Sequence, residues 1–180
     1  MEKIKIGNRK PKKYFITSGH GESDIQIHAG SFDLALRNAG IENYNFLFYS
    51  SIIPPDAVEI DKKGVEHGAV VETIAAVSNT QNNKRVTSGL VIGWVNNIET
   101  QKRVLGLVAE YGGHGSYGEA KDILNSSLDE MFESRFDKDK YEIAKREMYM
   151  ESFVPKKRYA TSLVAICFVE YEVPILESLK

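Results

Sequence analysis

The chain has 180 residues, of which 42% are hydrophobic and 27% charged, and its formal net charge is −2. This composition predicts one globular domain with a sizeable core, and the small net charge argues against a surface devoted to nucleic acid. Because no apolar run is long enough to span a membrane or to form the core of a signal peptide, and because the single Cys167 can form no internal disulfide, we expect a cytoplasmic protein without a membrane partner.

The first thirteen positions are strongly basic. Their basic residues are Lys3, Lys5, Arg9, Lys10, Lys12 and Lys13. We expect residues 1–13 to form an arm that is solvated or bridges subunits, and residues 14–180 to form the single domain. Residues 13–17 predict a strand, and the glycines that follow predict a loop over residues 18–24. This loop lacks the third glycine or lysine of a phosphate-binding motif.

A short amphipathic helix is predicted over residues 31–38. Its apolar residues recur at helical spacing, at Phe32, Ala35, Leu36 and Ala39. Ser31 is a plausible N-cap, and Gly40 is expected to stop the helix. Asp33 and Leu36 lie three positions apart and therefore share one face, near the start of the next strand.

The run from Asn43 to Tyr49 is rich in aromatic residues and predicts a strand. It ends on Ser50 and Ser51, and Pro54 and Pro55 then stop the strand from continuing, so we expect a constrained turn at the serines. A serine hydroxyl can reach the preceding carbonyl carbon, and a distorted peptide could thus rearrange to an ester. β-Elimination would then cut the chain, and hydrolysis of the resulting dehydroalanine would give a pyruvoyl group. The alternative is an ordinary exit from a strand.

The rest of the chain is dominated by strands. Strands are predicted at residues 68–77, 87–95, 103–111, 141–153 and 159–173. Asparagine-rich loops between the first three favour antiparallel pairing. Cys167 has apolar neighbours in the last strand and is expected to be a small core residue rather than a nucleophile.

One further helix is predicted between these strands. Ser116 and Glu119 form a capping-box pattern, and the apolar residues of an amphipathic helix extend from there to Phe132. The chain has no internal repeat or low-complexity tract. Helices at only a few points among many strands predict an α+β fold, in which helices cover mainly antiparallel sheets.

Several of these motifs occur together in one known family. They are the helix ending in Ala-Gly-Ile and the Asn-x-Asn pattern within residues 31–45, the Ser-Ser-Ile-x-Pro-Pro motif of residues 50–55, and the Glu-Tyr pair that ends residues 106–111. In these motifs the chain resembles the pyruvoyl-dependent arginine decarboxylases. The resemblance runs with gaps from Tyr14 to Tyr171.

The resemblance implies a four-layer αββα sandwich whose protomers form trimers, with active sites at the subunit contacts. It also implies self-cleavage between Ser50 and Ser51, which gives a chain of residues 1–50 and a chain of residues 51–180 that begins with a pyruvoyl group derived from Ser51. Glu110 is the implied proton donor. A pyruvoyl ketone can bind a substrate amine and accept electrons as carbon dioxide leaves, so neither pyridoxal phosphate nor a metal is expected.

The implied reaction converts L-arginine to agmatine and carbon dioxide. Asp33 occupies the position of the family's guanidinium-binding aspartate, Leu36 could line the aliphatic part of the substrate, and Asn45 could hydrogen-bond the substrate or the precursor carbonyl. The histidines show no metal-ligand spacing; they are His20, His28, His67 and His114. The chain departs from the family in the loop at residues 17–24 and in a longer hairpin at residues 81–85.

Two alternatives stay open on the sequence. A pyruvoyl-dependent decarboxylase could act on another amino acid such as histidine, although imidazole offers less to Asp33 than a guanidinium does. An uncleaved homologue could instead serve as a trimeric binding or scaffold protein. The intact mass of the protein would decide between cleaved and uncleaved forms.

Overall fold

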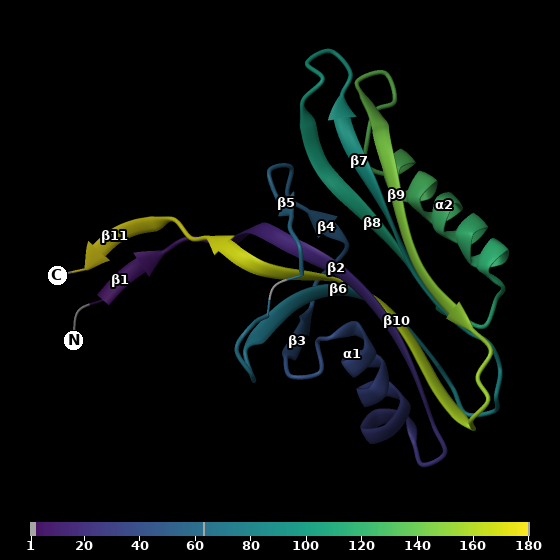
Figure 1. The fold of residues 1–180 in the computed structure, drawn as a ribbon. Helices are drawn as coiled ribbons and strands as arrows, with labels where there is room; N and C mark the ends of the chain where they lie inside the picture. The colour runs from purple at the N-terminus through teal and green to yellow at the C-terminus, as the bar shows by residue number, and fades with distance from the viewer. Residues whose placement is uncertain (1–2, 63, 180) are drawn as a thin grey trace.

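The computed structural model describes residues 3–62 and 64–179, so residues 1 and 2 of the predicted arm and residues 63 and 180 of the predicted domain lie outside the described residues. Figure 1 shows two twisted sheets packed face to face, with helix α1 (Asp33–Ala39) on the outer side of one and helix α2 (Tyr117–Glu133) on the outer side of the other. The α+β prediction is thereby confirmed.

The first sheet has five strands, and its order places the longest strands at the centre. In order, the strands are β3 (Asn45–Phe48), β6 (Val70–Thr80), β10 (Tyr159–Glu172), β2 (Lys10–Ser23) and β5 (Val58–Glu59). β10 runs antiparallel to both β2 and β6, whereas the short edge strands β3 and β5 run parallel to their neighbours.

The second sheet has four strands and is antiparallel throughout. In order, they are β4 (Ile52–Ile53), β8 (Arg103–Gly113), β7 (Val86–Asn97) and β9 (Tyr141–Phe153). Separately, β1 (Lys3–Ile6) and β11 (Ile175–Leu179) form an antiparallel ribbon that extends from the body in Figure 1. The long strands were predicted, but β1, β4, β5 and β11 were not, because short edge strands carry too little periodic pattern.

Successive side chains of the central strands point to opposite faces and so contribute to three separate apolar cores. On β10, Leu163, Ala165 and Cys167 face α1, whereas Val164, Ile166 and Phe168 face the second sheet. On β7, Leu90 and Ile92 complete the core between the sheets, and Val91 and Val95 pack beneath α2 with Leu124 and Leu128. Side chains on a strand alternate between its faces, so each long strand contributes to two cores. The result is the four-layer αββα sandwich, with Cys167 in the core as predicted.

The loop predicted over residues 18–24 is wrong, because β2 continues as a strand to Ser23. Its glycines let α1 lie close to the sheet. A Cβ atom on Gly19 would stand 2.4 Å from the carbonyl oxygen of Ala35, and one on Gly21 would stand 2.4 Å from that of Ser31. The glycines therefore allow the backbone of the helix to approach the strand closely. In the sequence they resemble the glycines of a loop.

The predicted helix is present, but its start differs from the prediction. A π-helical turn, η1 (Ile27–Phe32), precedes α1, and Ser31 lies inside this turn instead of capping the helix. The Ser31 hydroxyl is buried and pairs with the Thr161 hydroxyl at 3.0 Å, so β10 satisfies it. The predicted end is confirmed, since Gly40 adopts a left-handed conformation with φ of +67°.

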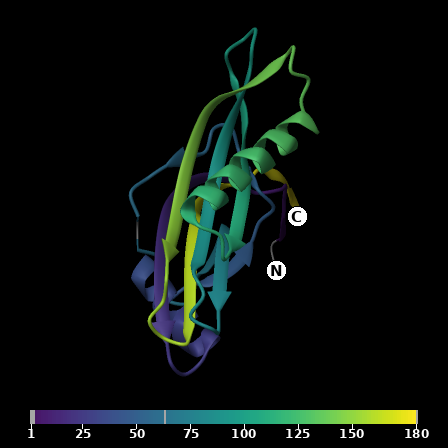
Figure 2. The same cartoon turned by 90° about the vertical axis from the view of Figure 1, so that its right-hand side faces the viewer.

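Helix α2 begins at the predicted capping box. The Ser116 hydroxyl accepts from the Glu119 backbone N–H, and the Glu119 carboxylate accepts from the Ser116 N–H at 2.7 Å. Figure 2 shows the helix lying across the outer face of its sheet. The hairpin predicted at residues 81–85 is wrong: these residues join β6 to β7, which belong to different sheets and do not pair, so only the antiparallel pairing of β7 with β8 is confirmed. Across the part of the chain that the structure describes, no helix is long and apolar enough to cross a membrane.

We expect Gly19→Ala to destabilise the fold, because the added methyl group would collide with the backbone of α1 and force the helix off its sheet. Overpacking of this kind costs about 1–3 kcal/mol. The measurement is the urea midpoint of unfolding. Gly118→Ala is the control, because a Cβ atom at Gly118 in α2 meets nothing within 4 Å. Equal midpoints for the two variants would contradict the assigned role of Gly19.

Candidate active site

The chain passes from one sheet to the other at the serine pair. β3, in the five-stranded sheet, ends at Phe48, and β4, in the four-stranded sheet, begins at Ile52. Packed sheets lie about 10 Å apart, and four residue steps reach at most about 14 Å. The connection through Ser50 and Ser51 therefore has little slack.

Ser51 has a strained backbone. Its φ is +40°, in the left-handed region where a residue with a Cβ atom pays roughly 1–2 kcal/mol. The Ser51 carbonyl accepts from the Val108 N–H at 3.0 Å, and Ile52 and Ile53 pair with β8 directly afterwards. Because the flanking strands fix both ends of the link, the strain at Ser51 is maintained, as the predicted constrained turn requires.

The Ser51 side chain meets a single carboxylate. Its hydroxyl donates to Glu110 Oε1 at 2.8 Å. β8 supplies Glu110 directly after the buried residues Leu107, Val108 and Ala109, so the carboxylate emerges at the edge of an apolar core. One side of Glu110 reaches solvent, but the surrounding atoms exclude enough water that burial raises the pKa of its carboxyl, against the lowering effect of the Ser51 hydrogen bond.

This arrangement combines a nucleophile, a base and a strained peptide. The Glu110 carboxylate is placed to take the hydroxyl proton of Ser51, and a carboxyl with a raised pKa is a better proton acceptor when ionised. The same group, once protonated, can return a proton to an atom near position 51. Chemistry that begins on the Ser51 oxygen and needs a proton relay is therefore supported by the geometry.

The other predicted residues lie away from this pair within one chain. Asp33 is exposed in the first turn of α1, and Asn45 is exposed at the start of β3, where its side-chain amide donates to the Gly68 carbonyl at 2.8 Å. Among the described residues, neither Asp33 nor Asn45 hydrogen-bonds Ser51 or Glu110. The structure thus brings together the two predicted catalytic residues, whereas Asp33 and Asn45 make no hydrogen bond to them within one chain.

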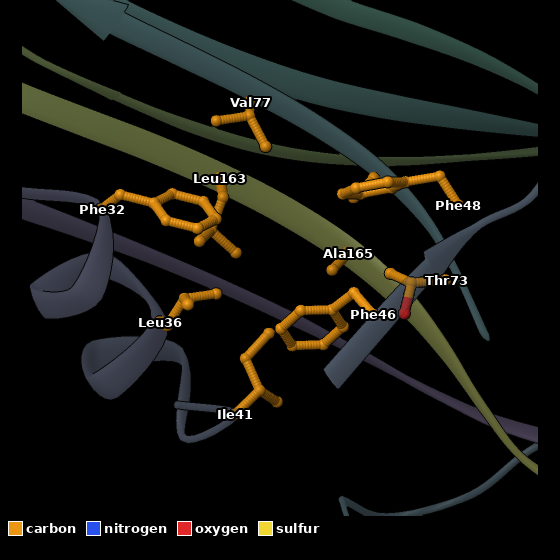
Figure 3. Close-up of a pocket in the computed structure, with 10 residues that line it drawn as sticks. Phe32, Leu36, Ile41, Phe46, Phe48, Thr73, Val77, Leu163 and Ala165 are labelled. Atoms are coloured by element: carbon orange, nitrogen blue, oxygen red, sulfur yellow. The ribbon is translucent and has the colours of Figure 1, made fainter. Parts of the chain in front are cut away.

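Leu36 lines an apolar groove between α1 and the five-stranded sheet (Figure 3). Phe32 and Leu36 face it from the helical side, and Phe46 and Phe48 face it from β3. In Figure 3, Phe32 and Phe48 stand at opposite ends of the groove. Because Phe48 lies three residues before Ser51, the groove connects the helix that carries Asp33 with the link between the sheets.

The sequence does not predict an ion pair near the serine link in which a buried carboxylate binds a partly exposed guanidinium. Glu72 in β6 is only 2% exposed, and its carboxylate pairs with the guanidinium of Arg9. Arg9 had been grouped with the basic arm. The available signal was Glu72 itself, a charged residue inside the apolar run Val70–Ile74, since a buried carboxylate requires a partner.

Two of the histidines, His20 and His114, make ordinary polar contacts. His20 Nδ1 pairs with Glu151 at 2.9 Å, and His114 Nδ1 pairs with the Arg85 carbonyl at 2.7 Å. Across residues 3–62 and 64–179, no three His, Cys, Asp or Glu side chains cluster in a way that could hold a metal ion.

Comparison with known proteins gives one consistent result. A family model described as pyruvoyl-dependent arginine decarboxylase matches residues 13–173. A pyruvoyl-dependent arginine decarboxylase of Methanopyrus kandleri is 35% identical over 128 residues, which cover 71% of this chain and 79% of that protein. The protein of that name from Methanococcoides burtonii is 32% identical over 141 residues, covering 72% and 74%. A pyruvoyl-dependent arginine decarboxylase of Chlamydia abortus is 30% identical over 191 residues, covering 92% and 94%.

The raised pKa of Glu110 predicts a pH-dependent stability. In Ser51→Ala only burial acts on the Glu110 carboxyl, so ionisation of the carboxyl opposes folding. We expect the free energy of unfolding of Ser51→Ala, relative to Ser51→Ala/Glu110→Gln, to be highest below the ordinary carboxyl pKa and to fall as the pH rises through the raised value. Urea unfolding at a series of pH values measures this difference. A difference that stays constant with pH would show that Glu110 is not desolvated.

Proposed function

Because the chain belongs to the pyruvoyl-dependent arginine decarboxylase family, we propose that it converts L-arginine to agmatine and carbon dioxide after cutting itself between Ser50 and Ser51. Family membership makes the protein a carboxy-lyase that uses a covalent pyruvoyl group in place of pyridoxal phosphate. The observation that carries the proposal for this chain is the 2.8 Å contact between the Ser51 hydroxyl and Glu110, at a residue with positive φ.

In the proposed self-cleavage, Glu110 takes the hydroxyl proton and the Ser51 oxygen attacks the carbonyl carbon of Ser50. The bond between that carbon and the Ser51 nitrogen breaks as the nitrogen takes the proton back from Glu110, which leaves an ester and a free amine. Loss of the Ser51 α-proton then breaks the Cβ–O bond, and residues 1–50 depart with a terminal carboxylate. Water converts the remaining dehydroalanine into the pyruvoyl group that begins residues 51–180, with release of ammonia. Strain at Ser51 favours this sequence, because cleavage releases the left-handed conformation.

When formed, the pyruvoyl group supplies a ketone that binds the substrate amine and draws electrons as carbon dioxide leaves. Glu110 holds a proton beside position 51 and delivers it to the α-carbon of the substrate. The raised pKa of Glu110 supports this assignment, since it increases the protonated fraction at neutral pH.

We assign substrate recognition to residues outside the catalytic pair. Asp33 would pair with the guanidinium, which two charge-assisted hydrogen bonds can hold in one orientation. Leu36 would contact the aliphatic stem, a role supported by its place in the apolar groove. Asn45 would hydrogen-bond the substrate or the precursor carbonyl, after releasing the Gly68 carbonyl that its amide now contacts.

The separation of these residues within one chain supports an assembly in which neighbouring protomers complete each site. We propose trimers with active sites at the subunit contacts. Leu47 and Phe48 on the edge strand β3 are 51% and 66% exposed, directly before the serine link. Large apolar side chains on an open sheet edge are typical of surfaces that another chain covers.

Cleavage is tested by intact mass. Wild-type protein should separate into residues 1–50 and 51–180 under denaturing conditions, and the larger fragment should react with a carbonyl-reactive amine. Ser51→Ala should stay intact, because it lacks the attacking oxygen. Ser50→Ala is the matched control and should still be cut, because the attacked carbonyl belongs to its backbone. A wild-type chain that remains a single species would favour the uncleaved scaffold alternative.

Substrate selectivity is tested with Asp33→Asn. This change keeps the side-chain volume and removes the negative charge, so kcat/KM for arginine should fall by an amount equivalent to roughly 2–5 kcal/mol while cleavage of the chain is retained. Carbon dioxide release from arginine, ornithine, lysine and histidine is the assay. Asp122→Asn, an exposed aspartate in α2, is the control. An equal fall in carbon dioxide release from all four substrates would show that Asp33 does not recognise the guanidinium.

A further inference from the structure

The buried carboxylate of Glu72 lies beside the link between the sheets. In β6, Glu72 pairs in register with Leu47 of β3 on one side and with Phe168 of β10 on the other. It shares a strand face with Ile74 and Ala76, so its side chain points toward the core between the sheets. A carboxylate in this position is costly unless a cation pairs with it, and the cation is Arg9.

Arg9 connects this buried charge with the surface around the serines. Its side chain is 53% exposed, and its guanidinium carbon lies 5.4 Å from the centre of the Tyr171 ring. Arg9 also lines a surface hollow together with Tyr49, Ser50 and Ile52. Arg9 therefore shares a surface hollow with Ser50, whose carbonyl the proposed cleavage would attack, and Glu72 pairs with the Arg9 guanidinium.

Three lysines that follow Arg9 are paired with carboxylates elsewhere. Lys10 and Lys12 both bind the Asp56 carboxylate, at 2.7 and 2.6 Å. Lys13 binds Glu170 at 2.7 Å. Among these four residues, Arg9 is the one that lines the hollow beside Ser50.

Cleavage would create a new negative charge in this hollow. It would turn the neutral Ser50 carbonyl into a terminal carboxylate, next to a guanidinium whose five N–H donors allow it to bind two carboxylates at once. The precursor has no such group. Arg9, which already pairs with Glu72, would therefore gain a second carboxylate ligand only after the chain has been cut.

We propose that Arg9, anchored by Glu72, binds the carboxylate that cleavage creates on Ser50 and so retains the end of the 1–50 chain away from the pyruvoyl group. The proposal rests on the proposed self-cleavage. Arg9 is a positioning residue: it would order the tail of the cleaved chain and does not touch the reacting atoms. Without it, the last residues of the 1–50 chain would fray and could re-enter the site.

The test is digestion of native, processed protein with a carboxypeptidase, followed by mass measurement of the 1–50 chain. The enzyme removes Ser50 only when the tail detaches. In Arg9→Gln, trimming should be faster by about tenfold or more, the factor that one charge-assisted hydrogen bond is worth. Arg9→Lys should restore part of the protection. Lys10→Gln, which removes a neighbouring cation paired with Asp56, should behave as wild type.

A matched pair of variants removes the effect of leaving Glu72 buried without a partner. Arg9→Gln/Glu72→Gln compared with Glu72→Gln should show the same acceleration, and this comparison is decisive if Arg9→Gln alone folds poorly. A cleaved protein with equal trimming rates in every pair would overturn the role of Arg9 and leave the proposed function standing. A chain that is never cut would overturn both proposals, and its single intact mass identifies that outcome.

Discussion

The passage of the chain from one sheet to the other between Phe48 and Ile52 is the constraint on which the rest of the site depends. β3 belongs to the five-stranded sheet and β4 to the four-stranded sheet, and the short link between them crosses the edge of the shared core. The pairing of each strand with its own sheet fixes the two ends of the link. Ser51 then adopts a conformation that a free chain would avoid, and its hydroxyl is held against Glu110 on the strand next to β4.

The same contact would couple the proposed self-cleavage to the decarboxylation that we propose for the cleaved protein. In the precursor, the Ser51 hydroxyl donates to Glu110 and opposes the rise in the pKa of its carboxyl that burial causes. Conversion of Ser51 to a pyruvoyl group would remove that donor. The carboxyl would then be left with the effect of burial alone, so the step that makes the electrophile would also increase the fraction of Glu110 that holds a proton at neutral pH.

Much of the layered architecture was predictable, because it depends on local patterns in the sequence. Runs of strand-forming residues between turn signals indicated the long strands, the pair Ser116 and Glu119 indicated the start of α2, and the serines ahead of Pro54 and Pro55 indicated a constrained turn. Gly19 and Gly21 misled the prediction, since close approach of a helix and a loop both favour glycine. The pair of Arg9 and Glu72 joins residues 63 positions apart, and a pairing at that distance has no local pattern. Asp33 and Asn45 gain a role only if a neighbouring protomer supplies the rest of the site.

Because of the strand order, cleavage would change folding from a reaction of one chain into an association of two chains. Residues 1–50 contribute β2, which lies inside the five-stranded sheet between β10 and β5, and also β3, which pairs with β6. Both partners of β2 belong to residues 51–180, so the two pieces made by cleavage would stay interleaved and could part only by dismantling a sheet. The precursor can fold as one chain, whereas the cut molecule, once unfolded, could refold only by association of two chains. Its apparent stability would then depend on protein concentration, and the single chain would be the form in which the fold is built.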